Sequence, residues 1–183
     1  GLPLILVTAA CGVVAAFEWT RMASQAEVAA VRMAQYALMG VAAACAVWAG
    51  SQSLELVAAV ALIGAALAGG LAVLGKGSLS WMAFGAIYTT LPFGCFVWIR
   101  ELAPQGQWLL MAILAIVWTT DIGAYFAGRG FGGPLLSPKD SPNKTWNGAI
   151  GALVCAGLAG AAVARAGGGD FGHWLMFGLL LSI

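Results

Sequence analysis

Residues 108–127 read WLLMAILAIVWTTDIGAYFA, an apolar run in which Asp121 is the only charged side chain. A helix that spans a bilayer needs about 20 consecutive apolar residues, so this run predicts a transmembrane helix. A carboxylate inside such a helix costs about 2.5–3.5 kcal/mol on insertion scales, and intramembrane acids usually mark functional sites. At 1.5 Å per residue, Asp121 is expected about 9 Å from the end of the run. It is the first candidate functional residue, although an acid paired with a neighbouring helix is the simpler alternative.

The same apolar pattern recurs along the whole chain. Hydrophobic residues make up 62% and charged residues 8% of the sequence, and the mean hydropathy is +0.94. Soluble domains carry about 25% charged residues, so this class of protein is excluded. We predict an all-α, polytopic integral membrane helix bundle of about seven transmembrane segments, the first and last of them partial. The predicted segments cover residues 2–17, 33–50, 54–75, 80–99, 108–127, 146–164 and 171 onward.

We treat residues 1–183 as a single transmembrane domain and, because the sequence starts at Gly1 and stops within an apolar run, as a fragment of a longer protein. The net charge is +1 and no basic tract is present, which argues against nucleic acid as a partner. The four cysteines are isolated within apolar runs, so the sequence indicates neither a zinc site nor a disulfide framework.

The basic residues predict the orientation of the chain. The first, third and fifth connections hold six basic residues, and the second, fourth and sixth hold two. The six are Arg21, Arg32, Lys76, Arg129, Lys139 and Lys144, and the two are Arg100 and Arg165. Cytoplasmic loops carry an excess of Lys and Arg, so loop 128–145 is expected on the cytoplasmic side of the membrane.

Loop 128–145 concentrates the polar residues of the chain. It contains Arg129 within a glycine run, GRGFGG, whose backbone can approach phosphate oxygens but can equally form a flexible turn. It ends in SPNKTWNG at residues 141–148, where Ser141 followed by proline predicts the start of a helix. Lys144 and Thr145 would lie in the first turn, beside unpaired N–H groups that attract anions. Simple capping with a lysine that reaches the membrane surface is the alternative.

Tyr125 follows Asp121 by one helical turn, which places both side chains on one face of the predicted helix. The tyrosine hydroxyl therefore belongs to the same candidate pocket as the carboxylate.

The pattern W-x-x-D-x-G-A-Y-x-x-G-R-x-x-G at residues 118–132, followed by S-P-x-K-T-W-x-G at residues 141–148, resembles the phosphatidate cytidylyltransferase (CDP-diacylglycerol synthase) family. The resemblance implies a multi-pass enzyme of the bacterial cytoplasmic (inner) membrane that forms a homodimer. It implies condensation of CTP with phosphatidic acid to give CDP-diacylglycerol and pyrophosphate, with Mg²⁺ as cofactor and a second cation as an option. The acidic signature that the family carries near its C-terminus is absent from these residues and is expected beyond Ile183.

On this interpretation Asp121 and Lys144 are the candidate catalytic residues, and Asp121 is also a candidate metal ligand. The candidate substrate-binding residues are Ser141, Thr145, Asn143, Arg129 and Tyr125. Two alternatives stay open. One is a CTP-dependent lipid kinase of the polyprenol or phytol type, and the other is an ion-coupled membrane transporter that uses Asp121 as a relay.

Overall fold

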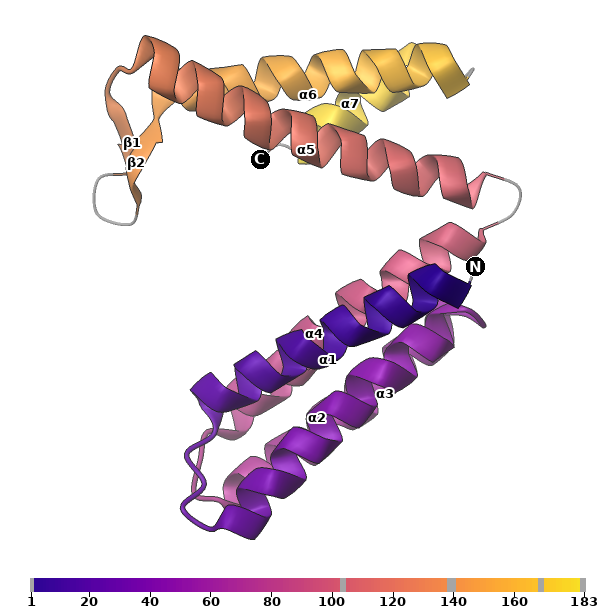
Figure 1. Cartoon of the computed structure of the whole chain (residues 1–183), viewed down its shortest axis with the longest axis vertical. Helices are drawn as coiled ribbons and strands as arrows, with labels where there is room; N and C mark the ends of the chain where they lie inside the picture. The colour runs from indigo at the N-terminus through magenta and orange to yellow at the C-terminus, as the bar shows by residue number, and fades with distance from the viewer. Residues whose placement is uncertain (1, 103–104, 138–140, 168–169, 182–183) are drawn as a thin grey trace. The chain divides into compact units, whose positions relative to one another are not determined.

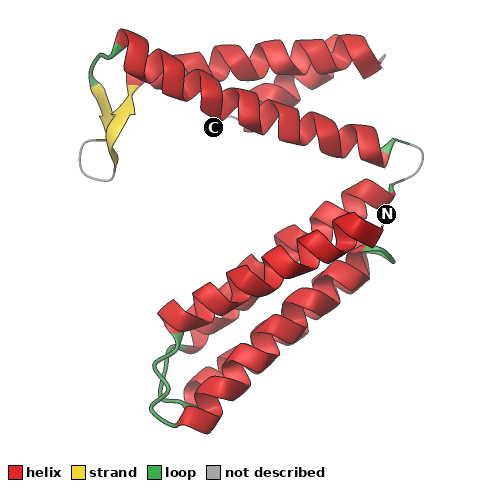
Figure 2. Ribbon diagram, in the orientation of Figure 1, coloured by secondary structure: helices red, strands yellow, loops and turns green. Residues whose placement is uncertain are grey.

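The computed structural model describes residues 2–102, 105–137, 141–167 and 170–181, and helices account for most of them (Figure 1). The helices are α1 (Leu2–Ala23), α2 (Ala29–Gly50), α3 (Leu54–Leu74), α4 (Leu79–Glu101), α5 (Gly106–Phe131), α6 (Trp146–Gly167) and α7 (Phe171–Leu181). Two short strands, β1 (Leu135–Ser137) and β2 (Ser141–Thr145), lie between α5 and α6 (Figure 2).

The helices α1 to α6 are each long and apolar enough to cross a membrane, so the predicted class of polytopic helical membrane protein is confirmed. Helix α1 continues to Ala23, beyond the predicted end at residue 17. Glu18 and Arg21 therefore lie inside the helix, where their carboxylate and guanidinium groups come within 3.8 Å at i,i+3 spacing. Such pairs are compatible with a helix surface, and this explains why two charged residues did not end the helix.

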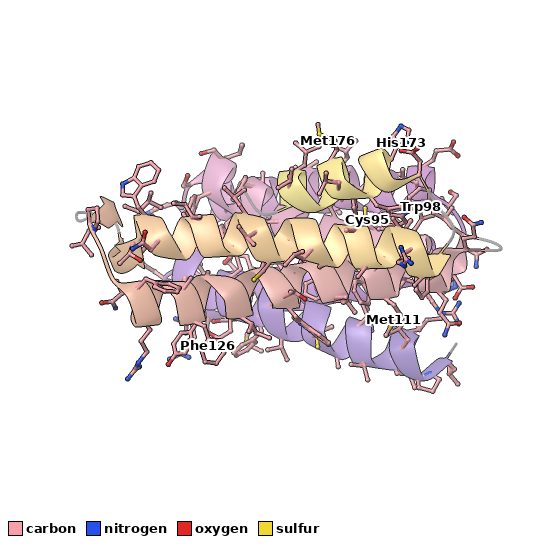
Figure 3. All side chains as sticks on the ribbon, turned by 90° about the horizontal axis from the view of Figure 1, so that it is seen from above. Cys95, Trp98, Met111, Phe126, His173 and Met176 are labelled. Carbon is pink, nitrogen blue, oxygen red and sulfur yellow. The ribbon has the colours of Figure 1, made fainter. Side chains whose placement is uncertain are left out.

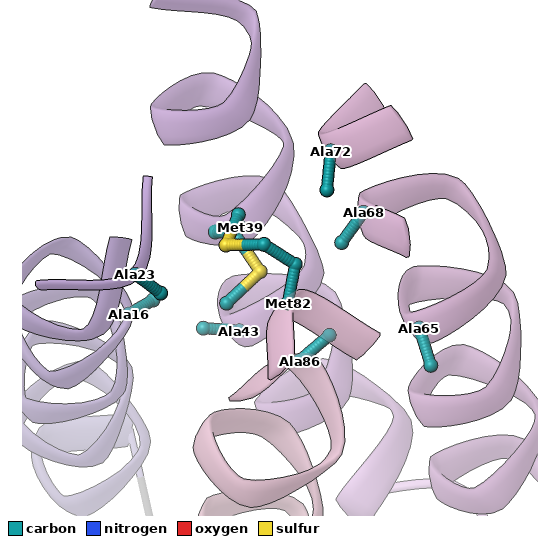
Figure 4. Close-up of a cluster of buried hydrophobic side chains, with 9 residues drawn as sticks. All are labelled: Ala16, Ala23, Met39, Ala43, Ala65, Ala68, Ala72, Met82 and Ala86. Atoms are coloured by element: carbon teal, nitrogen blue, oxygen red, sulfur yellow. The ribbon is translucent and has the colours of Figure 1, made fainter. Parts of the chain in front are cut away.

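The chain divides into two compact units, Gly1–Gln107 and Trp108–Ile183. The core of the first unit consists of two methionines among small side chains (Figure 4). Its members are Ala16, Ala23, Met39, Ala43, Ala65, Ala68, Ala72, Met82 and Ala86. Alanine side chains allow helices to approach closely, and the resulting van der Waals contacts between helices stabilise their association in a lipid environment.

Gly85 of α4 makes room for the indole of Trp19 from α1. A Cβ atom at Gly85 would overlap the indole ring. The ring also packs against Trp81, with 4.9 Å between centroids, and against Tyr88, with 5.5 Å between centroids. Trp19 Nε1 is buried without a hydrogen-bond partner in the described part of the chain. The indole therefore holds α1 against α4 by packing contacts and not by a hydrogen bond from its Nε1.

In the second unit, bare glycines set the spacing of the helices. A Cβ atom at Gly123 of α5 would lie 2.9 Å from the carbonyl oxygen of Gly151 in α6. A Cβ atom at Gly178 of α7 would lie 2.6 Å from the carbonyl oxygen of Ala156 in α6. These distances are shorter than ordinary contacts, so only glycine allows the backbones to approach this closely. The close seam between α5 and α6 brings the polar end of α5 to the start of α6.

Helix α7 begins with a side-chain cap. The carboxylate of Asp170 accepts a hydrogen bond of 3.0 Å from the backbone N–H of His173. This bond holds the pKa of Asp170 below its ordinary value, and the nearby imidazole of His173 adds to the effect. His173 projects from the first turn of α7, and Met176 follows it on the same helix (Figure 3).

Candidate functional site

Helix α5 ends four residues later than predicted. Residues 128–131 are helical, and the backbone N–H of Gly132 still donates to the Gly128 carbonyl at 3.1 Å. The chain then turns at Gly132 and Gly133, whose φ angles of +58° and +104° favour glycine. The glycine run is therefore partly the last turn of a helix, and the loop proper starts at Gly132. Asp121 lies ten residues before the helix end, about 15 Å along the axis.

Three candidate residues form one ridge along α5, because Asp121, Tyr125 and Arg129 follow each other at intervals of four residues. All three are exposed. The guanidinium of Arg129 donates a hydrogen bond of 3.1 Å to the hydroxyl of Tyr125, and its central carbon lies 6.0 Å from the ring centroid. The predicted shared face of Asp121 and Tyr125 is thus present in the structure.

Within the described residues, the carboxylate of Asp121 makes neither a hydrogen bond nor an ion pair. The alternative of an acid that is already paired with a neighbouring helix therefore finds no support in this part of the chain. An unpaired carboxylate in an apolar segment is costly, which keeps Asp121 as a candidate for binding a cation or a polar substrate group.

The segment before α6 is a strand, and the predicted helix start at Ser141 is wrong. Strand β2 pairs antiparallel with β1, with Leu135 opposite Thr145 and Ser137 opposite Ser141. Helix α6 begins only at Trp146, and Thr145 is its cap, since its hydroxyl oxygen accepts a 3.1 Å hydrogen bond from the backbone N–H of Gly148. Serine and threonine are both good caps. Because Ser141 pairs with Ser137 of β1, Thr145 and not Ser141 caps the helix.

The start of α6 offers fewer free donors than the sequence predicted. The backbone N–H of Trp146 donates to the Pro134 carbonyl at 3.0 Å, and that of Gly148 is taken by Thr145. Two of the first three N–H groups of the helix therefore have partners, so the expectation of an unpaired first turn is wrong for them.

The last turn of α5 touches the end of β2. A Cβ atom at Gly128 would lie 3.2 Å from the Thr145 hydroxyl oxygen. Arg129 and Lys144 are the chain neighbours of these two contact residues, and both are exposed. Lys144 has no partner among the described residues. The fold therefore brings the helix end that carries Arg129 against the strand end that carries Lys144.

The predicted phosphate-binding residues of β2 lie in an irregular strand. Leu135 pairs with Thr145 but Ser137 pairs with Ser141, so the register of the hairpin shifts within β2 and regular alternation does not assign its side chains to two sides. Asn143 is exposed, and Ser141 is half-buried. The candidates thus lie on two neighbouring elements, Arg129 on the last turn of α5 and Ser141, Asn143, Lys144 and Thr145 on β2.

Sequence analysis assigned no role to two features of this unit. One is Asn147, whose side-chain amide donates a 2.9 Å hydrogen bond to the carbonyl of Gly132. The other is an open, mainly apolar groove of about 680 Å³ between α5 and α6. The groove is lined by Thr119, Ile122, Gly123, Phe126, Ala127, Phe131, Asn147, Ile150, Gly151, Val154 and Cys155. Both features depend on contacts between distant parts of the sequence, which carry no local signal.

No group of three or more His, Cys, Asp or Glu side chains that could hold a metal ion occurs among the described residues. Magnesium is usually held by one or two carboxylates together with substrate phosphates. Asp121 therefore fits as one ligand of a magnesium ion, and the other described acid of the second unit, Asp170, lies at the start of α7.

Comparison with known proteins gives a consistent result. The model of the cytidylyltransferase family matches residues 1–183. A phosphatidate cytidylyltransferase of Brucella suis biovar 1 is 35% identical over 184 residues, which cover 92% of this chain and 62% of the relative. That of Rickettsia bellii is 37% identical over 81 residues, which cover 44% of this chain and 35% of the relative. That of Haemophilus influenzae is 50% identical over 52 residues, which cover 28% of this chain and 18% of the relative. No solved structure matches the chain significantly.

Proposed function

Since the chain belongs to the cytidylyltransferase family, we propose that the protein transfers the cytidylyl group of CTP to phosphatidic acid, giving CDP-diacylglycerol and pyrophosphate. The observation that carries this proposal is the family match over residues 1–183, together with relatives that are named phosphatidate cytidylyltransferase. The chain spans 62% of the length of the Brucella relative, so the activity is proposed for the protein to which these residues belong.

The chain is a multi-pass membrane protein. We place it in the inner membrane of a bacterium, with the β1–β2 hairpin on the cytoplasmic side. This orientation follows from the excess of basic residues in the alternate connections, and the relatives are bacterial. A lipid substrate can then arrive through the bilayer and CTP through the cytoplasm, so the two meet at the membrane surface. A homodimer stays a prediction.

In the proposed reaction, an oxygen of the phosphatidate phosphate attacks the α-phosphorus of CTP. A new P–O bond forms there, and the bond to the β-phosphate breaks, so that pyrophosphate leaves. Both reactants are anions, and catalysis of such transfers depends mainly on positioning and charge stabilisation. Arg129 and Lys144 are the side chains that we assign to the phosphates; the contact between their chain neighbours, Gly128 and Thr145, supports this assignment.

The remaining candidates have supporting roles in this proposal. Tyr125 holds the guanidinium of Arg129 through their 3.1 Å hydrogen bond. Ser141, Asn143 and Thr145 offer hydroxyl and amide groups to the nucleotide. Asp121 is proposed as one ligand of magnesium, which would neutralise phosphate charge when bound.

Two isotopic labels of CTP separate the candidate functions. The native protein in vesicles that contain phosphatidic acid should transfer label from α-³²P CTP, and none from γ-³²P CTP, into the lipid fraction. A lipid kinase would transfer the γ-phosphate instead, and a transporter would label no lipid. Transfer of the γ-label, or no labelled lipid at all, contradicts the proposed function.

A further inference from the structure

We propose that Asn147 is a positioning residue, which ties the start of α6 to the turn after α5 and thereby holds the β1–β2 hairpin, with Lys144 on it, against the end of α5 that carries Arg129. The proposal rests on the proposed function only where it concerns CTP; the holding role stands on the geometry alone.

The turn that leads into the hairpin is tied to the start of α6 at two points. The backbone N–H of Trp146 donates to the Pro134 carbonyl at 3.0 Å. The side-chain amide of Asn147 donates to the Gly132 carbonyl at 2.9 Å. Only the second tie comes from a side chain, so one substitution removes it and leaves the backbone intact.

Glycine residues in the turn leave the space that the Asn147 side chain occupies. A Cβ atom at Gly133 would lie 2.8 Å from the amide nitrogen of Asn147, so the amide packs directly on a bare glycine. Gly132 and Gly133 both have positive φ angles, a conformation that few other residues adopt. Asn147 is half-buried at this contact. The turn residues and the amide thus form one local arrangement.

The consequence concerns the two cations. Arg129 is attached to α5, which is rigid up to the turn, and its guanidinium is held by Tyr125. Lys144 is attached to β2, whose position depends on the hairpin. Without the Asn147 tie, the hairpin can move relative to α5, and the two charges no longer meet the phosphates of one nucleotide in a fixed geometry. Misplaced binding groups lose much of their effect on a charged substrate.

Hydrogen exchange of the native protein tests the holding role without reference to function. Asn147→Ala should raise the exchange of the backbone amides at residues 133, 135–137 and 146 by about three- to tenfold, the effect of losing one hydrogen bond. Asn147→Asp should act in the same direction, because an ionised carboxylate accepts hydrogen bonds and cannot donate one to a carbonyl. Ile150→Ala, one turn further along α6, is the matched control and should leave these amides unchanged. Unchanged exchange in both Asn147 variants overturns the proposal.

Steady-state kinetics test the consequence for CTP. If Asn147 positions the cations for nucleotide binding, Asn147→Ala should raise the KM for CTP by about three- to tenfold, while kcat and the KM for phosphatidic acid stay within about twofold. A merely structural role would lower the amount of active protein and leave the KM unchanged, and that result overturns the positioning role. If the wild-type protein turned over no CTP, the proposed function would fail, and the hydrogen exchange would still decide the holding role.

Discussion

Replacing Lys144 with alanine removes an exposed ammonium group, which has no partner among the described residues, from β2 and leaves the strand pairing through the backbone in place. A hydrogen bond to a charged group contributes about 1.5–3 kcal/mol. At about 1.4 kcal/mol per factor of ten, the loss predicts a kcat/KM for CTP that is lower by roughly ten- to a hundredfold. The assay is incorporation of label from α-³²P CTP into lipid, with the amount of inserted protein measured in the same membranes.

Arg165→Ala is the control, since it removes a positive charge from the last turn of α6, at the other end of the helix that follows Lys144. It should leave kcat/KM within about twofold, because the length of the helix, about 30 Å, exceeds the distance over which salt screens a surface charge. If Lys144→Ala keeps the wild-type rate, or if Arg165→Ala loses as much, then Lys144 does not contact the phosphates and the assignment of Lys144 to the nucleotide is refuted.

Three further perturbations test other parts of the structure. Asp121→Asn keeps the size and removes the charge, so kcat should fall by at least about tenfold, or ~1.4 kcal/mol; a normal rate would make Asp121 a structural residue. Gly85→Ala introduces a methyl group into the space of the Trp19 indole, and should destabilise the first unit by about 1–3 kcal/mol; thermal unfolding followed by tryptophan fluorescence measures this, and an unchanged Tm contradicts the packing. The pKa of Asp170 is lowered in the folded protein. Its cap on α7 therefore stabilises the protein fully at pH values above the ordinary carboxyl pKa of about 3.9, and this stability is lost as the pH falls through the lower, folded-state pKa. Asp170→Asn should remove this loss of stability from acid unfolding curves, and a loss that persists excludes Asp170 as its source.

The membrane-spanning helices could be predicted from sequence because bilayer thickness imposes one length on every span. Their ends could not, because charges at a helix end can be accommodated by pairs along its surface. Glu18 with Arg21, and Tyr125 with Arg129, are such pairs, and both lie inside helices that continue past the predicted boundary.

One part of the candidate site could be predicted because it depends on local sequence patterns. The other part could not, because it depends on contacts between residues that are distant in the sequence. The shared face of Asp121 and Tyr125 follows from helical periodicity, which is a local property. Arg129 joins them only because α5 continues past the predicted end at residue 127. The hairpin does not follow from a local pattern, since Ser141 is a good local cap and becomes a strand residue only because β1 pairs with it. The hydrogen bond from Asn147 joins residues 15 positions apart, so no local sequence pattern predicts it.

The most direct test of the central claim is the labelling of a single cysteine on the hairpin in a cysteine-free background. Asn143→Cys lies on an exposed position of β2, and Gln105→Cys on an exposed position before α5 supplies the control for the opposite side of the membrane. We predict that a membrane-impermeant maleimide labels Asn143→Cys only from the cytoplasmic side, that CTP slows this labelling, and that Gln105→Cys is labelled only from the other side at a rate that CTP does not change. Labelling of Asn143→Cys from the outer side, or a rate that saturating CTP leaves unchanged, would show that the hairpin is not the nucleotide site.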